Sequence, residues 1–476
     1  MSDNRVYRGA LVAAPRIGHA RMGLRVVALA CVWLSSGARA ETIGGALAKA
    51  YLNNPNINQQ RAAVRAQDEN IPKNYAGYLP QVGASASAGV QNTLVGESAG
   101  GGNGDFLSHP RTLSAQFSQN VWNGNKTFNS IRQAESQVFG QREVLRNTEQ
   151  TVLLAALTDY MNVLRDTAIL DLDRNNVDVL QEQLRQTRDR FNVGEVTRTD
   201  VAQAEASLSG AQATALTAQS TLQTDIANYR QDVGDEPKSL APVSPLTRQI
   251  PKNLTEAVAI SQVEHPAIVA SLHGVDAAEL GVKISESALY PTVGVTGAIT
   301  KEYDPSGFAT GTQVLAGSLI GNVTIPIYQG GAEYATVRQS KETLGQTELQ
   351  TDQQRDVVRA LVVGAWGSNQ NSLGIVRASK AQVDAAEVAL AGVREEAKVG
   401  QRTTLDVLNA QLTLLQARVQ LVSAQHDQVV NSYNLLAAIG RLSIKSLGVS
   451  VPEYDPRVHF DQVKNKWIGL RTPDGK

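Results

Sequence analysis

The stretch Glu395–Leu408, E-E-A-K-V-G-Q-R-T-T-L-D-V-L, decides the fold. Long runs of helix-forming residues flank it, and Gly400 is the place where the chain can turn back. After the turn, apolar residues recur at spacings of three and four: Leu405, Leu408, Leu412, Leu415, Val419 and Val422. This is the pattern of a coiled-coil seam, so the stretch predicts the tip of a long helical hairpin.

The same design occurs earlier in the chain. Arg190–Ala204, R-F-N-V-G-E-V-T-R-T-D-V-A-Q-A, also has Val-Gly at a turn before a helix. Gly194 and Gly400 differ by 206 positions, and Asp200 and Asp406 differ by the same number. The returning helix has the three-four spacing as well, through Val201, Ala204, Leu208, Ala211, Ala215, Ala218 and Leu222. One helical hairpin is therefore used twice.

This duplication gives the domain organisation. We place the first repeat at 41–234 and the second at 254–440, with a proline-rich linker at 235–253 between them. Residues 1–40 precede the repeats, and a polar tail, whose structure the pattern leaves open, covers 441–476.

Residues 1–40 are typical of an export signal. Arg21 and Arg25 precede an apolar run at 26–34, and Ala38-Arg39-Ala40 fits the rule for a cleavage site. A start at Met22 would leave a signal of ordinary length. The apolar run is far shorter than the roughly 20 residues of a spanning helix.

The single cysteine, Cys31, lies inside this signal, so the mature chain has none. Lipid attachment at Cys31 is the alternative, but it would leave an apolar core of only about five residues.

Composition excludes several classes of function. Only 5% of the 476 residues are aromatic, which favours long helices packed through Ala, Val and Leu over one large globular core. Without residues 1–40 the chain has 38 basic and 44 acidic residues, so nothing favours nucleic-acid binding. The six histidines are scattered, and we find no phosphate loop, His-Glu-x-x-His or Gly-x-Ser-x-Gly motif. We therefore predict no cofactor, no metal site and no enzyme.

Each repeat also contains two runs that alternate apolar and polar residues. In the first they occupy Gln81–Gln91 and Leu113–Val121, joined by a glycine-rich loop at 98–105, and span 81–121 together. In the second they occupy about 292–301 and 314–328. Such pairs of roughly ten residues are typical of a transmembrane β-barrel, although an ordinary surface hairpin has the same pattern.

Four strands per chain cannot close a barrel, and lipid does not tolerate an open sheet edge. We therefore expect the chain to oligomerise through its strands. Two copies would give eight strands and three would give twelve, enough for a lumen. The uninterrupted helix predicted at 124–192 would be about 100 Å long and would extend this wall as a tube.

The sequence resembles the TolC family of outer-membrane efflux ducts. The resemblance rests on the two repeats with their strand pairs, on R-F-N-V-G (190–194) with T-D-V (199–201), and on V-G (399–400) with R-T (402–403) and D-V-L (406–408). It implies a mixed α and β membrane protein, in which a trimer shares a twelve-stranded barrel that a long periplasmic α-helical barrel continues. It also implies the outer membrane of a Gram-negative bacterium.

The family resemblance implies an exit duct that carries small toxic compounds or secreted proteins. Its partners would be outer-membrane lipid, a periplasmic adaptor and an inner-membrane transporter of the RND, ABC or MFS type, and it would bind no nucleic acid. The competing hypothesis is a periplasmic coiled-coil adaptor or scaffold without a pore.

The same resemblance assigns a gate at the helix tips. Asp406 matches the family's constriction aspartate, and Asp200 and Arg402 match a latch between hairpins. Three copies of Asp406 around an axis would form a ring that favours cations. The alternative is that Asp200 and Asp406 only cap helices. Asn409 and Ala397 depart from the family pattern, at positions of a second aspartate ring and a latch tyrosine, which puts tight closure in doubt.

The exposed turns are predicted to meet the adaptor, although a turn needs such residues in any case. These residues are Gly194, Glu195, Val196 and Thr197 in the first repeat, and Gly400, Gln401 and Thr403 in the second.

Overall fold

The computed structural model describes residues 40–95, 104–305 and 311–475. The predicted signal, with Met22 and Cys31, lies outside the described residues except for Ala40, and so do residues 98–103 of the glycine-rich loop. The described residues belong to one unit that begins at Ala40. No helix in these ranges is long and apolar enough to cross a membrane.

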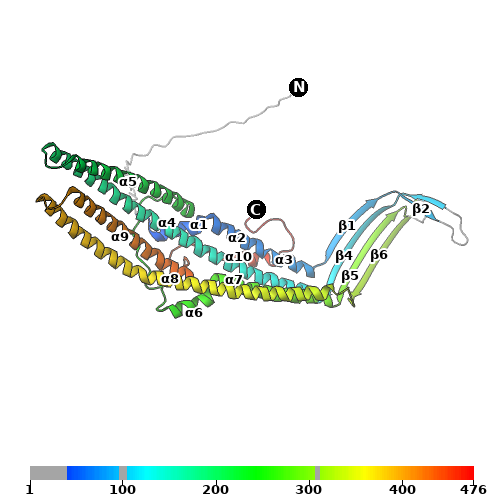
Figure 1. Cartoon of the computed structure of the whole chain (residues 1–476). Helices are drawn as coiled ribbons and strands as arrows, with labels where there is room; N and C mark the ends of the chain where they lie inside the picture. The colour runs from blue at the N-terminus through cyan, green and yellow to red at the C-terminus, as the bar shows by residue number, and fades with distance from the viewer. Residues whose placement is uncertain (1–39, 96–103, 306–310, 476) are drawn as a thin grey trace, which may run out of the picture. The chain divides into compact units, whose positions relative to one another are not determined.

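Two helical hairpins of equal size dominate this unit (Figure 1). In the first, α4 (Lys126–Asn192) has 67 residues and α5 (Arg198–Val233) has 36. In the second, α8 (Ala332–Lys398) and α9 (Thr404–Ile439) have the same two lengths. A helix of 67 residues is about 100 Å long, as the sequence predicts.

The predicted apolar stripe of α5 faces α4. Ala204 is 1% exposed, and the other residues of the stripe are half-buried. The leucine stripe of α9 behaves differently. In the half of the hairpin nearer the tip, the residues of α9 that pack against α8 are Ala410, Leu414, Ala417 and Leu421, a second stripe with the same spacing. The stripe beginning at Leu405 is therefore not the seam of its own hairpin, because it lies on another face of α9.

The strands form one antiparallel sheet in the order β1-β4-β5-β6. Their ranges are β1 (Gln81–Ala88), β4 (Arg111–Asn123), β5 (Thr292–Tyr303) and β6 (Gln313–Thr324). The pair β4–β5 joins the two repeats, with Ala115 opposite Ile299. Among the described residues, no strand pairs with the outer edge of β1 or of β6.

The sheet departs from the predicted strands in three places. The first hairpin is interrupted at Gly89 and Pro110, and it continues as a separate pair, β2 (Gln91–Val95) and β3 (Gly104–Ser108). Pro110 has no N–H to donate to a ladder, which explains the break. Pro326 ends β6 before the predicted end at Tyr328 for the same reason. A bulge between Asn120 and Trp122 places Trp122 opposite Val293.

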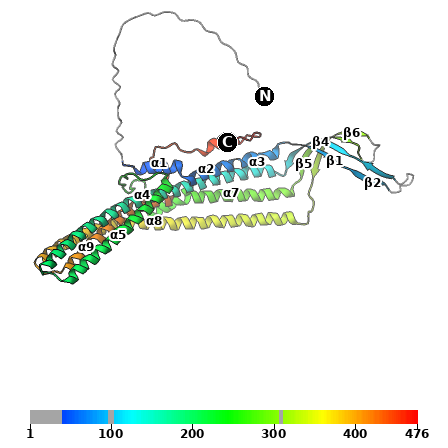
Figure 2. The same cartoon turned by 90° about the horizontal axis from the view of Figure 1, so that it is seen from above.

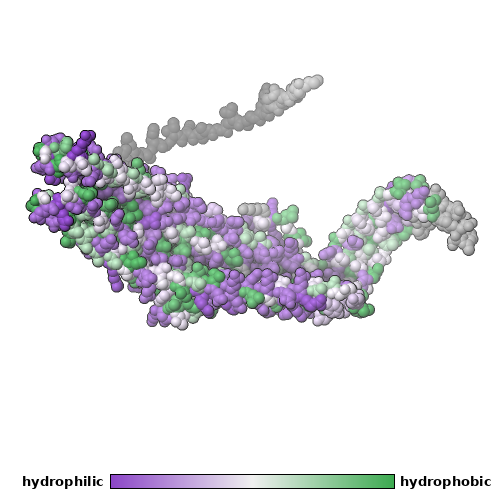
Figure 3. Space-filling view, viewed as in Figure 1, coloured by the Kyte–Doolittle hydropathy of each residue, from purple (hydrophilic) through white to green (hydrophobic). Residues whose placement is uncertain are grey.

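The alternation of side chains is as predicted. One face of the sheet carries Val, Ala, Leu and Ile, and the other carries mostly Ser, Thr, Gln and Asn. The described residues leave the apolar face uncovered, since Val82 and Leu319 are 79% and 73% exposed. Figure 3 shows the contrast between the largely polar helical surface and the paler and apolar residues over the strands.

Shorter helices pack along the long ones from their middle toward the sheet (Figures 1 and 2). In the first repeat these are α1 (Ile43–Asn53), α2 (Pro55–Asp68) and α3 (Asn70–Tyr75), followed by a 3-10 turn, η1 (Ala76–Tyr78). The sequence predicts one helix over about 57–78, but it breaks at Glu69. Pro72 has no N–H for the carbonyl of Asp68, which accounts for the break. The second repeat has α6 (Leu254–Glu264), α7 (Pro266–Glu286) and η2 (Ser287–Leu289).

The main apolar core lies where α1, α4, α5 and α9 meet, and both the linker and the tail contribute to it. Tyr160 of α4 is fully buried, with its hydroxyl 2.6 Å from the carbonyl oxygen of Glu41 and 2.7 Å from that of Ala241. Leu442 of the tail is 1% exposed, and α10 (Pro456–Val463) packs on α2. The tail is thus an ordered part of the core region.

Candidate functional site

The two hairpin tips have the same backbone. Gly194 and Gly400 adopt φ angles of +79° and +81°, a left-handed conformation that glycine reaches without steric cost. The amide of Glu195 donates to the carbonyl of Arg190 at 2.9 Å, and that of Gln401 donates to the carbonyl of Glu396 at 3.0 Å. Each ascending helix therefore ends in a defined turn.

Asp200 and Asp406 each complete a capping box at the start of the returning helix. The backbone N–H of Thr403 donates to Asp406 Oδ2 at 2.9 Å, and the N–H of Asp406 donates to Thr403 Oγ1 at 3.2 Å. Thr197 and Asp200 repeat this geometry at 2.8 and 3.3 Å. The capping role that the sequence offers as an alternative is therefore present in both tips.

These hydrogen bonds also keep the two aspartates ionised. The backbone and hydroxyl hydrogen bonds from Thr403 hold the pKa of Asp406 below its usual value. The hydroxyl and backbone hydrogen bonds from Thr197 do the same for the pKa of Asp200. Capping and a permanent negative charge are compatible, because the same contacts produce both.

The tips differ in the direction of their ion pairs. In the first, Arg190 at the end of α4 donates from Nε to Oε2 of Glu195 in the turn at 2.9 Å. In the second, Arg402 in the turn donates from Nε to Oε2 of Glu396 at the end of α8 at 2.7 Å. Arg190 and Glu396 are equivalent positions of the two repeats. The ascending helix therefore supplies the basic partner of the ion pair in the first tip and the acidic partner in the second.

The structure places the predicted latch residues on different tips. Asp200 is paired with Thr197, and Arg402 is paired with Glu396, each within its own hairpin. The hydrogen bond to Glu396 raises the pKa of Arg402, and Asp406 adds a weaker attraction. In this chain Arg402 thus lies near Asp406 and not against Asp200.

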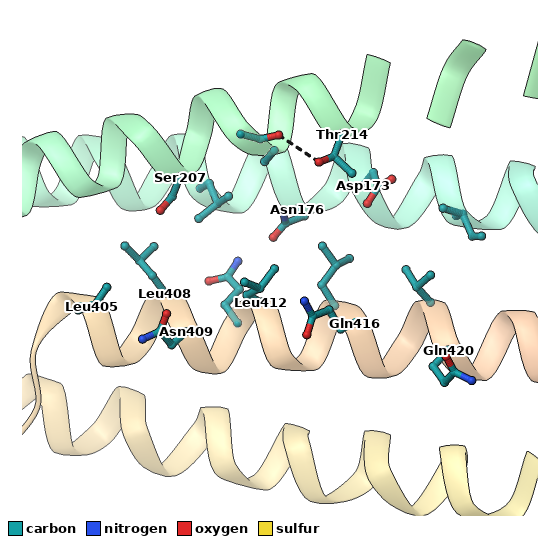
Figure 4. A pocket seen from close by; sticks show the side chains of 17 residues that line it. Asp173, Asn176, Ser207, Thr214, Leu405, Leu408, Asn409, Leu412, Gln416 and Gln420 are labelled. Carbon is teal, nitrogen blue, oxygen red and sulfur yellow. Dashed lines mark hydrogen bonds between the residues drawn. The ribbon is translucent and has the colours of Figure 1, made fainter. Parts of the chain in front are cut away.

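The predicted adaptor-contacting residues all lie in the two turns. Val196 is half-buried, while the other six are exposed: Gly194, Glu195, Thr197, Gly400, Gln401 and Thr403. Ala397 and Asn409 are the two positions that depart from the family pattern. The carbonyl oxygen of Ala397 accepts a hydrogen bond from the amide of Gly400 at 3.2 Å. Asn409 points from α9 into a groove between the hairpins (Figure 4).

A band of aromatic side chains, which the sequence analysis missed, lies where the strands meet the helices. Trp122 and Tyr290 form an edge-to-face pair with ring centroids 6.4 Å apart, and Tyr75 and Tyr78 form another at 5.7 Å. These four rings are between 38% and 53% exposed. Exposed Trp and Tyr are enriched at membrane–water interfaces. The three tyrosines lie just before a strand and Trp122 lies at the end of β4, and these positions are the signal that could have found them.

Comparison with known proteins extends these findings. The family model for outer membrane efflux proteins matches residues 46–234 and 259–441. The outer membrane efflux protein BepC of Brucella suis is 42% identical over 445 residues, which cover 94% of this chain and 95% of BepC. Outer membrane protein TolC of Escherichia coli is 26% identical over 441 residues, covering 89% of this chain and 87% of TolC.

A solved structure has the same fold. The outer membrane channel CmeC of Campylobacter jejuni superposes with a TM-score of 0.76 and covers 89% of each chain, at 15% sequence identity.

Proposed function

Because the chain belongs to the outer membrane efflux protein family, we propose that it is the exit duct of a tripartite export system. It is an outer-membrane protein with the TolC-like combination of a small sheet and long helices. Membership in this family leaves no support for the competing hypothesis of an adaptor without a pore.

One observation carries the proposal: within the described residues, the four-stranded sheet has two unpaired edges and an exposed apolar face. A lipid-facing sheet with open edges would leave unsatisfied backbone groups, each of which costs several kcal/mol in hydrocarbon. The sheet has an even number of strands, and each strand is antiparallel to its neighbours. The edge strands β1 and β6 therefore run in opposite directions, so β6 of one copy can pair antiparallel with β1 of the next. Three copies give a twelve-stranded barrel with a lumen.

The trimer can be tested with cysteines, because the mature chain has none. Ser85→Cys in β1 is combined in turn with Ala316→Cys, Ser318→Cys or Ile320→Cys in β6, all on the polar face. Oxidation should give covalent dimers and trimers but no tetramers in at least one register. A ladder that stops at the dimer, or the absence of any interchain bond, would contradict a closed trimer.

The hairpin tips and the helical tube would contact the partner proteins of the export system. Exposed turns at the far end of the helices from the sheet are the place where a periplasmic adaptor could dock and connect an inner-membrane transporter (Figure 1). Crosslinking in cells followed by co-purification tests this. Recovery of an adaptor with a drug pump would indicate efflux of small toxic compounds, and recovery with an ABC transporter would indicate protein secretion.

The gate is proposed at Asp406. Its carboxylate is ionised because of its capping hydrogen bonds, so three copies near the axis would place three negative charges in one constriction. Arg402, which Glu396 holds beside Asp406, would determine the strength of the negative electrostatic field in this constriction.

A further inference from the structure

A cavity of about 720 Å³ lies between the two hairpins and extends along α9 from Leu405, in its first turn, to Gln420. α4 and α5 form one wall, and α9 forms the other (Figure 4). Small-molecule sites in proteins typically have volumes of roughly 300–1,000 Å³. The cavity therefore has the size of a ligand site.

Two buried polar groups that line this cavity have no partner within the described residues. Asp173 of α4 is only 4% exposed, and none of the hydrogen bonds or ion pairs of the described chain involves it. Gln411 of α9 is 8% exposed, and its Oε1 accepts no hydrogen bond. Burial raises the pKa of Asp173, as expected for a carboxyl without a compensating charge. Buried polar groups are nearly always satisfied, so this pair requires an explanation.

Both groups can accept hydrogen bonds, and the α9 wall opposite Asp173 contributes leucines alongside the amide side chains of Asn409, Gln416 and Gln420. Leu408, Leu412 and Leu415 belong to the stripe of α9 that does not pack against α8, and Figure 4 shows Leu408 and Leu412 directed at α4 and α5. Leu412 is 51% exposed in this chain. Acceptors that face an apolar surface suit a molecule with an ammonium group on a hydrophobic body.

A metal ion fits this site less well. The described residues contain no cluster of three or more His, Cys, Asp or Glu side chains able to hold one. Leucine side chains also give a strongly hydrated cation nothing to bind. An organic cation, in contrast, uses both kinds of wall.

We propose that the cavity between the hairpins binds an amphipathic organic cation, with its ammonium group at Asp173 and its apolar body on Leu412 and Leu415. The ammonium N–H groups donate to the carboxylate of Asp173. The apolar body covers leucine surface that the described chain leaves exposed. The ammonium position lies on α4, 19 residues before the end of that helix at Asn192, although the cavity extends to Leu405 and Leu408 beside Asp406. The site does not depend on the proposed export function.

The test uses the mature protein purified in detergent and the probe monodansylcadaverine, which joins a primary ammonium to an environment-sensitive apolar fluorophore. Binding should be saturable and should shift the emission to the blue relative to detergent alone. Asp173→Asn should weaken the affinity at least tenfold, because the ammonium loses its counter-charge. Leu412→Asn, at an exposed position that the fold does not need, should weaken it at least fivefold.

Two controls separate this site from general adsorption. Asp171→Asn removes an exposed charge two residues from Asp173 and should leave the affinity unchanged. Dansyl butylamide, which has the same fluorophore without the amine, should bind at least tenfold more weakly than the probe. Equal binding of the two molecules, equal affinity of the Asp173→Asn variant and the native protein, or the absence of saturation would each overturn the proposal.

Discussion

Two pairs of carboxyl groups lie one heptad apart between α4 and α5, and they predict that this hairpin tightens in acid. Asp159 shares a hydrogen bond with Asp232, and Asp166 shares one with Asp225. Burial, with repulsion from Asp232, raises the pKa of Asp159 to about 7, and burial raises that of Asp225 to about 6. Below about pH 7 the Asp159–Asp232 pair therefore holds a proton that the separated helices would release, and the Asp166–Asp225 pair does so only below about pH 6.

The sign follows from the raised pKa. In the separated helices Asp159 titrates near 3.8, so its contribution to packing is complete below that pH and is lost as the pH rises through about 7. A shift of about three pH units corresponds to about 4 kcal/mol. Because the carboxyl is only partly buried, solvent screening reduces this to roughly 2 kcal/mol. About two thirds of that loss falls between pH 5 and pH 8, or about 1.3 kcal/mol.

Hydrogen–deuterium exchange of α5 amides measures this effect. After correction for the intrinsic exchange rate, protection should fall about tenfold from pH 5 to pH 8, the equivalent of about 1.3 kcal/mol. Asp159→Asn should keep most of the protection at pH 8, because the amide cannot ionise. Asp178→Asn, at an exposed position of α4, should behave like the native chain. Protection that is constant, or that rises with pH, would refute the reasoning.

Four further predictions concern the gate and the core. Asp406→Asn should lower cation selectivity at least about twofold in planar bilayers, while Asp200→Asn should not. Asp406→Ala should in addition lose about 1 kcal/mol of helix capping, measured by hydrogen–deuterium exchange at the tip. Arg402→Ser should raise single-channel conductance or the leak of large antibiotics; unchanged values for both Arg402→Ser and Asp406→Ala would remove the gate assignment. Tyr160→Phe should lower stability by roughly 1–3 kcal/mol, seen as earlier thermal unfolding. His459→Ala should cost about 3 kcal/mol at neutral pH, because buried Asp68 would lose its 2.9 Å partner and keep only Arg142 at 3.9 Å, and it should expose the tail to proteases.

The sequence predicts the tips residue by residue because the signals there are local. A glycine with positive φ and a Thr-x-x-Asp capping box each depend on fewer than about five neighbouring residues. The positions of Gly400 and Asp406 in the structure follow from those signals alone.

Features that depend on a distant partner could not be predicted in this way. Asp159 and Asp166, seven residues apart on a polar helix, have the pattern of a solvated face until α5 brings Asp232 and Asp225 against them. The bulge that moves Trp122 to the apolar face has no local signal as clear as the proline that splits α2 from α3. In the cavity, Asp173 becomes conspicuous only when α9 covers it.

The two stripes of α9 explain how one duplicated hairpin acquired two roles. α9 has one apolar stripe for α8 and a second, rich in leucine, that faces α4 and α5. At the equivalent positions of the second stripe, α5 has exposed residues that are small except for the last: Thr199, Ala202, Ala206, Ser209, Ala213 and Leu216. Small side chains let a neighbouring helix approach to the lower end of the roughly 8–10 Å range of helix packing. A closed ring of helices requires every helix to have a neighbour on both sides, and among the described residues α5 contacts α4, α1 and α9 but leaves this face exposed. We infer that this small-residue face of α5 is where the next copy packs, so the same closure that the open sheet edges require is also required by the helices.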